Sequence, residues 1–122
     1  MLILNSPPVD YRLCTQTVTV YHREGDGQYT RTIHPRAFLD CRKTQNVDKT
    51  GSSEASSFLL IIPGDRQTVV PGDKILLGEG DPIHTREEWA NLIPSKVPNL
   101  VVVKYADAKY WGTQIVHTEA GG

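Results

Sequence analysis

Cysteine, net charge and long apolar runs are all scarce in this sequence, and each shortage excludes a class of protein. The two cysteines, Cys14 and Cys41, lack C-x-x-C spacing and have no histidine at the spacing of a metal site. We therefore expect two reduced thiols, with a disulfide or a shared metal as the less favoured alternative. The formal charge of −1 excludes the strongly basic surface that phosphate-driven binding of nucleic acid needs.

No apolar run is long enough to span a membrane. The first residues, MLILNSPP, hold a short apolar stretch without a cationic start or an A-x-A-like cleavage site. The sequence therefore predicts neither a signal peptide nor a membrane span, and a chain that stays in the cytoplasm where it is made.

Motifs of catalysis are missing as well. No G-x-S-x-G elbow or S-x-x-K pair accompanies the serines, and Gly78-Glu79-Gly80 lacks the Lys-Ser/Thr that follows a phosphate loop. We expect no enzyme, no cofactor and no metal site. The four histidines, none of which has metal-ligand spacing to another, are His22, His34, His84 and His117.

Acidic residues near glycines have two interpretations. Converging carboxylates would bind a divalent cation or activate a hydroxyl group. Three of the four lie in P-G-D or G-x-G-D turn contexts, where an aspartate usually accepts hydrogen bonds from nearby backbone N–H groups, so we favour turn chemistry. The four residues are Asp65, Asp73, Glu79 and Asp81.

Two β-patterned runs come early in the chain. In residues 13–23, LCTQTVTVYHR, β-branched side chains alternate with others as they do on a pleated strand. Gly25-Asp26-Gly27 then supplies a turn, and residues 28–38 resume the pattern, which predicts a hairpin over residues 13–38. Because proline cannot donate a ladder hydrogen bond, we expect Pro35 to interrupt the second strand near a sheet edge.

Later runs predict further strands. FLLII, residues 58–62, is wholly apolar and ends at Pro-Gly-Asp, as is typical of a central strand buried on both faces. Residues 74–77 and 100–103 are shorter strands between turns. Residues 107–109 predict a turn, after which residues 111–118 return antiparallel.

One helix is predicted over residues 85–93. Thr85 and Glu88 have the spacing of a capping box, and Pro94 ends the helix. Its apolar face is formed by Trp89, Leu92 and Ile93.

A long polar loop is predicted over residues 40–57, DCRKTQNVDKTGSSEASS. It has almost no large apolar side chain and cannot offset its ordering entropy by burial. The fold class that follows is a single mainly β domain over residues 1–122, a small antiparallel β-barrel or sandwich of about six strands with one short helix.

The second half of the chain resembles a known family. FLLIIP, VVPGDKILLGEG, the helix ending in IP and VVVKYADAKYWGTQIVHTEAGG follow one another in residues 55–122. This order resembles the minor capsid or head–tail connector proteins of tailed phages and prophages. The residues that match the family order are Asp73, Gly78, Asp107, Gly112, His117 and Gly121.

The resemblance implies a non-enzymatic virion protein. Such a protein is a small β-barrel that assembles as a homo-oligomeric ring beneath the portal, closes the head and receives the tail. Its partners are the portal or adaptor and the tail proteins, with no membrane, no sequence-specific nucleic acid and at most passing contact with packaged DNA. It lies in the virion neck, and in the host bacterial cytoplasm before assembly. The loop residues expected to serve assembly are Asp40, Arg42, Lys43, Lys49, Ser52 and Ser53.

An alternative belongs to a different class. Tyr105, Tyr110 and Trp111 could together form a platform for a small ligand or for nucleic acid bases. The expected basic groove is missing, however, and cross-strand packing is the commoner role of such rings. For His117 we expect a hydrogen-bonded structural imidazole.

Overall fold

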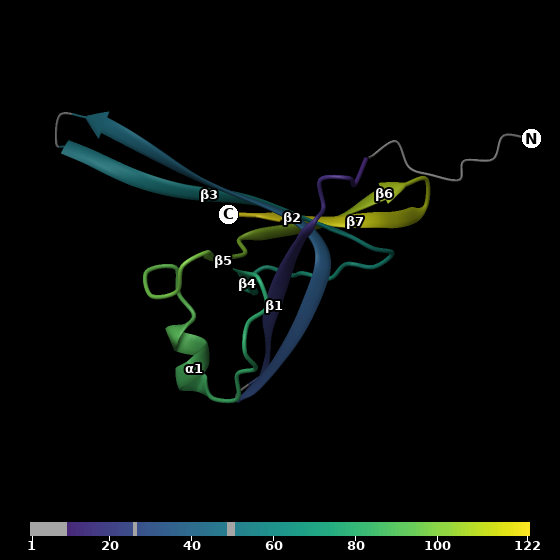
Figure 1. Cartoon of the computed structure of the whole chain (residues 1–122), viewed down its shortest axis with the longest axis horizontal. Helices are drawn as coiled ribbons and strands as arrows, with labels where there is room; N and C mark the ends of the chain where they lie inside the picture. The colour runs from purple at the N-terminus through teal and green to yellow at the C-terminus, as the bar shows by residue number, and fades with distance from the viewer. Residues whose placement is uncertain (1–9, 26, 49–50) are drawn as a thin grey trace, which may run out of the picture.

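The computed structural model describes residues 10–25, 27–48 and 51–122, and for residues 43–56 it describes the backbone only. The protein is mainly β, with one antiparallel sheet in the order β5-β4-β1-β2-β3-β7-β6 and one short helix (Figure 1). This confirms the predicted class, with seven strands in the described residues instead of about six. The elements are β1 (Gln16–Gly25), β2 (Gln28–Asp48), β3 (Gly51–Pro63), β4 (Lys74–Leu77), α1 (Arg86–Asn91), β5 (Leu100–Val102), β6 (Tyr105–Trp111) and β7 (Gln114–Gly121).

Strand β2 gives the sheet its curl. Its first part pairs with β1 as far as Ala37, and its second part pairs with β3 from Phe38 onward, so β2 belongs to both halves of the sheet. The sheet therefore bends into a half-barrel around one core. The buried apolar side chains of that core are Val18, Val20, Ala37, Leu39, Phe58, Leu60, Ile62, Val69, Ile75, Val103 and Ala120.

The expectation for Pro35 is wrong. β2 runs unbroken through this proline and lies between β1 and β3, not at an edge. The register shifts between the pairs Val18↔His34 and Gln16↔Ala37, which places Pro35 in a β-bulge. A bulge leaves one residue outside the ladder, so the missing N–H of proline costs no hydrogen bond there.

The predicted loop over residues 40–57 is also wrong. Strands β2 and β3 stay paired without a shift from Phe38↔Ile61 to Asp48↔Gly51, so the segment is a long hairpin. β1 stops pairing with β2 at Ala37, and β7 reaches β3 only from residue 58 onward. Residues 42–57 are therefore a two-stranded ribbon, here called the arm, which projects away from the rest of the sheet (Figure 1).

Near the C-terminus the turn is displaced from its predicted position. β6 runs through residues 107–109, and the chain reverses at Gly112 and Thr113, between the paired Trp111 and Gln114. Gly112 has φ of 65°, a conformation that glycine adopts without steric cost and that Asp-Ala-Lys would not adopt readily.

The predicted helix is confirmed over most of its length. Thr85 is the N-cap, and the reciprocal capping box with Glu88 is present. The helix ends at Asn91, two residues before the predicted end. In the described part of the chain, no helix has the length and apolar character needed to cross a membrane.

Candidate functional site

Asp73 organises the turn that starts β4. Its backbone N–H donates to Val70 O at 3.2 Å and its carboxylate accepts from Val70 N–H at 3.0 Å, while Gly72 takes φ of 94°. The other carboxylate oxygen lies 2.6 Å from Nδ1 of His22 on β1. With Asp73 only 3% exposed, this pairing fixes the turn on the sheet, and the interpretation as turn chemistry is confirmed for Asp73.

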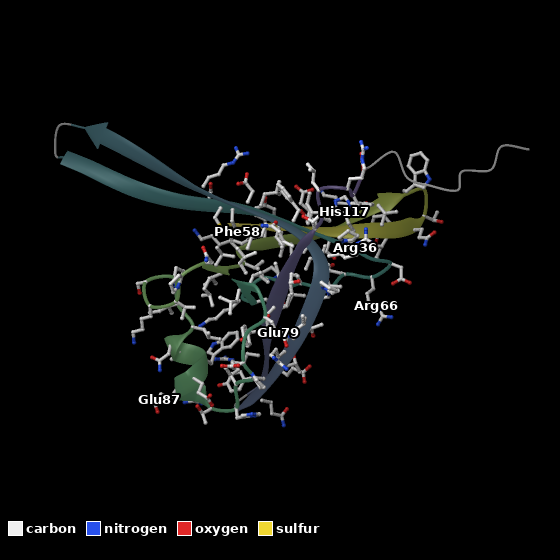
Figure 2. The ribbon with its side chains drawn as sticks, in the orientation of Figure 1. Arg36, Phe58, Arg66, Glu79, Glu87 and His117 are labelled. Carbon is white, nitrogen blue, oxygen red and sulfur yellow. The ribbon has the colours of Figure 1, made fainter. Side chains whose placement is uncertain are left out.

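The other carboxylates and histidines are dispersed. Asp65 lies beside Arg66 on the surface, and the backbone N–H of His84 donates to Glu88. Figure 2 shows Glu79 in the part of the molecule that holds α1, well separated from His117 on β7. Among the described residues, no three His, Cys, Asp or Glu side chains gather as a metal site requires.

Thr19 binds the segment after β4 onto β1, a role that the sequence pattern did not reveal. Its buried hydroxyl donates to Gly78 O at 2.7 Å and accepts from Gly80 N–H at 2.8 Å. The hydroxyl of Tyr21 donates to Asp81 O at 2.7 Å, and Arg31 donates to Gly80 O. A threonine inside a β-branched run looks like ordinary strand composition, so only the glycines that follow β4 hinted at this contact.

His117 binds the segment that precedes β1. Its Nδ1 lies 2.7 Å from the hydroxyl of Tyr11, and Nε2 lies 4.0 Å from Glu119. We assign the proton to Nε2, which faces the carboxylate, so the Tyr11 O–H donates to Nδ1. Burial lowers the pKa of His117, as does nearby Lys109, while Glu119 raises it. The expected hydrogen-bonded imidazole is present.

Helix α1 is held by a stack of three side chains. Trp89 stacks on Tyr29 of β2 with ring centroids 5.5 Å apart, and Lys74 Nζ lies 4.4 Å from the Trp89 ring. Lys74 also donates to Trp89 O at 2.7 Å, and burial lowers its pKa. A lysine that is buried and hydrogen-bonded in this way is a structural anchor for the helix.

The three C-terminal aromatic residues do not form one platform. Along β6, Tyr105 and Trp111 share a face while Tyr110 points to the opposite face, because side chains alternate along a strand. Tyr105 lies against Gly121, where a Cβ atom would overlap its ring. None of the ring contacts in the described chain joins these side chains.

The remaining family-matched residues have backbone or surface positions. Gly78 has φ of 93° and donates its N–H to Thr17 O at 2.7 Å, which ends β4. Asp107 is exposed on β6 opposite Glu119. Cys14 is buried and Cys41 is exposed, and both are free thiols.

The predicted assembly residues lie on or beside the arm. Asp40 and Arg42 form an ion pair of 2.8 Å at its base, but both are too exposed for the pair to add much stability. Lys43, Ser52 and Ser53 belong to the arm strands by their backbone, and Lys49 lies outside the described residues. The arm brings these positions together on one hairpin, far from any catalytic arrangement.

Comparison with known proteins covers the whole sheet. A model described as a family of unknown function (DUF6751) matches residues 13–122, a range that includes all the described strands, the helix and the arm. No curated protein matches the chain, and no solved structure does. Function therefore has to be argued from the chain's own residues.

Proposed function

The chain belongs to the DUF6751 family of unknown function, and we propose that it is a non-enzymatic head–tail connector subunit, of the head-closure or minor capsid type, from a tailed phage or prophage. In this role the curled sheet is a rigid body that assembles into a ring beneath the portal. The arm contacts a neighbouring subunit or faces the ring channel. The portal or adaptor and the tail proteins are the partners.

The arm is the observation that supports assembly. Its two strands pair with each other over residues 42–57 and with no third strand among the described residues. A two-stranded ribbon is marginally stable in water, and its outer edges present unpaired N–H and C=O groups. A partner that covers the ribbon would satisfy those groups, and a ring supplies such a partner from the next subunit.

A closed small barrel, the finer form of the predicted fold, also belongs to the proposal. β5 and β6 follow one another with only Val103 and Lys104 between them. Val103 N–H donates to Asp73 O at 2.9 Å, and Lys104 N–H donates to Gly121 O at 2.9 Å. The two residues thus link the β4 side of the sheet to the β7 side, as one bent strand of a six-stranded barrel would.

The placement of the charged and aromatic side chains is compatible with a scaffold. Asp73, Thr19 and Tyr11 each bind an irregular segment to the sheet, and Trp89 anchors the helix. Their polar atoms are used in internal contacts, which leaves the surface and the arm for partner recognition. Localisation in the virion neck follows from the connector role, with the host cytoplasm as the site before assembly.

Binding to a portal tests the proposal. The protein would be mixed with the portal protein encoded in the same genome and viewed by negative-stain microscopy. We expect rings of this protein on one end of the portal, and adjacent portal and tail genes in that genome. Absence of any association with the portal would contradict the connector role.

A further inference from the structure

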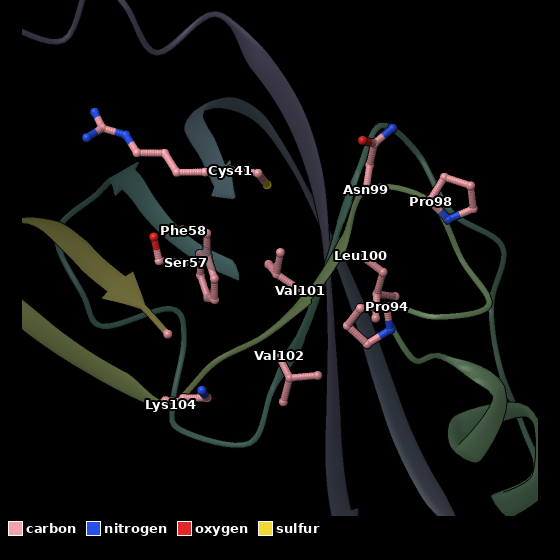
Figure 3. Close-up of a pocket in the computed structure, with 12 residues that line it drawn as sticks. Cys41, Ser57, Phe58, Pro94, Pro98, Asn99, Leu100, Val101, Val102 and Lys104 are labelled. Carbon is pink, nitrogen blue, oxygen red and sulfur yellow. The ribbon is translucent and has the colours of Figure 1, made fainter. Parts of the chain in front are cut away.

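A groove of about 500 Å³ lies between the base of the arm and β5 (Figure 3). Ser57 and Phe58 of β3 form one wall, and Leu100 to Val102 of β5 form the opposite wall. Gly122 lies at one end, where its carbonyl oxygen accepts from Phe58 N–H at 3.1 Å. The groove is therefore in line with β7 and occupies the position of a strand between β3 and β5.

The wall formed by β5 has open backbone groups. Asn99 and Val103 bond to β4, and Val101 lies opposite Ile75 between them, so these alternate residues face β4. The N–H and C=O groups of Leu100 and Val102 then face the groove, because hydrogen-bonding direction alternates along a strand. A Cβ atom on Gly122 would lie 3.0 Å from Val102 O, which agrees with this direction.

The wall formed by β3 continues the same pattern. Phe58 faces β7 and bonds to Gly122, so the alternate residues Ser56 and Glu54 turn their backbone groups to the same side. β7 does not extend along this part of β3. Both walls thus offer strand edges, and they are oriented so that one inserted strand would be antiparallel to each of them.

The lining also specifies side-chain chemistry. Most of it is apolar, with Phe58, Leu100 and Val102 joined by two prolines of the segment after α1. Of the described residues that line the groove, Arg42 and Lys104 are cationic and none carries an acidic side chain. Arg42 is already paired with Asp40 through Nε, whereas no ion pair of Lys104 occurs in the described part of the chain.

We propose that this groove binds an extended strand of a partner protein, apolar at alternate positions and carrying an acidic side chain that pairs with Lys104. Backbone hydrogen bonds to β3 and β5 supply affinity, and the apolar floor and the cation supply specificity. The inference goes beyond the connector role, since it depends on the sheet edges alone and holds for any partner with such a strand.

Peptide binding to the full chain tests the groove. The probe is a labelled, end-blocked nonapeptide with valine at alternate positions and one central glutamate, followed by fluorescence anisotropy. We expect saturable binding that weakens with added salt, and about tenfold weaker binding of the same peptide with lysine in place of glutamate. No saturable binding, or equal binding of the two peptides, would overturn the proposal.

Two pairs of variants locate the binding. Val102→Pro removes an N–H that faces the groove and spares the β4 pairing, and Val102→Thr is its control. Lys104→Glu reverses the charge, and Lys96→Glu is an exposed control outside the groove. We expect Val102→Pro and Lys104→Glu to weaken binding at least about tenfold while circular dichroism stays unchanged.

The remaining outcomes are equally decisive. Equal weakening by the control variants would overturn the proposal, because binding would then lie elsewhere. If the wild-type chain alone is a stable oligomer that Val102→Pro dissociates, the groove is filled by a second copy and the partner strand is excluded. A failure of portal binding with intact peptide binding would refute the connector role and leave this inference standing.

Discussion

Single side chains hold the irregular segments of this protein onto its sheet. Thr19 and Tyr21, neighbours but one on β1, bond the backbone of residues 78–81 through their hydroxyl groups. Tyr21 is 1% exposed, and burial raises its pKa. Because the ring is fixed by packing and by its hydrogen bond, the backbone that crosses it must come close, and Gly80 is the residue that does so.

Gly80→Ala should destabilise the fold. A Cβ atom there would overlap the Tyr21 hydroxyl and lie 2.7 Å from Leu76 Cδ2, and neither group can move freely. We expect the free energy of unfolding to fall by about 1–3 kcal/mol, measured by urea denaturation. Gly64→Ala is the control, since no atom lies within 4 Å of its added Cβ and the stability should be nearly unchanged.

His117 predicts how stability depends on pH. Burial lowers its pKa in the fold below the unfolded value of 6.5, so the unfolded chain takes up a proton first as the pH falls. The free energy of unfolding should therefore be constant above about pH 7 for this group and decrease as the pH falls from about 6.5 towards the folded pKa. Denaturation at a series of pH values measures this slope.

A pair of variants separates His117 from His34, whose pKa is also lowered by burial. His117→Gln should reduce the slope below pH 6.5, and His34→Gln should remove only the contribution of His34. An unchanged slope in His117→Gln would show that the hydrogen bond with Tyr11 does not depend on a neutral imidazole.

Among the elements, α1 is too short to be stable alone and depends on its contacts with the sheet. It has six residues, far fewer than an isolated helix needs in water, and none of them is fully buried. The capping box fixes its start, while the stack of Tyr29, Trp89 and Lys74 joins it to β2 and β4.

Trp89→Ala should detach the helix. Loss of the stacked ring and of the cation contact should lower the free energy of unfolding by about 2 kcal/mol, since the side chain is only partly buried. Amide hydrogen exchange of residues 86–91 should accelerate far more than that of the β3 core. Glu87→Ala, on the exposed side of α1, is the control, and an equal effect there would contradict the anchoring role of Trp89.

The elements that could be predicted from the sequence are those with a local chemical signal. The capping box of Thr85, the apolar run at residues 58–62 and the Pro-Gly-Asp turn each specify a conformation by themselves. The arm could not be predicted, because backbone pairing between polar segments leaves no burial pattern. The contacts of Thr19 and His117 join residues far apart in sequence, which composition does not reveal.

In the whole molecule, a curled sheet with one core carries a ribbon that adds no partner of its own. Residues 43–56 can be replaced by Asn-Gly without disturbing the body, because Arg42 and Ser57 form a pair that a two-residue turn can close. The shortened chain should fold with a melting temperature close to that of the wild type, as followed by circular dichroism. It isolates the arm from the rest of the protein.

The molar mass of the assembly with portal, measured by light scattering for the wild-type and the arm-shortened chain, tests the connector role most directly. We predict that the wild type adds several subunits to each portal, whereas the shortened chain stays folded and adds none. Equal assembly of both chains, or no assembly of the wild type, would contradict the proposal that the arm of residues 42–57 joins this protein to its neighbours.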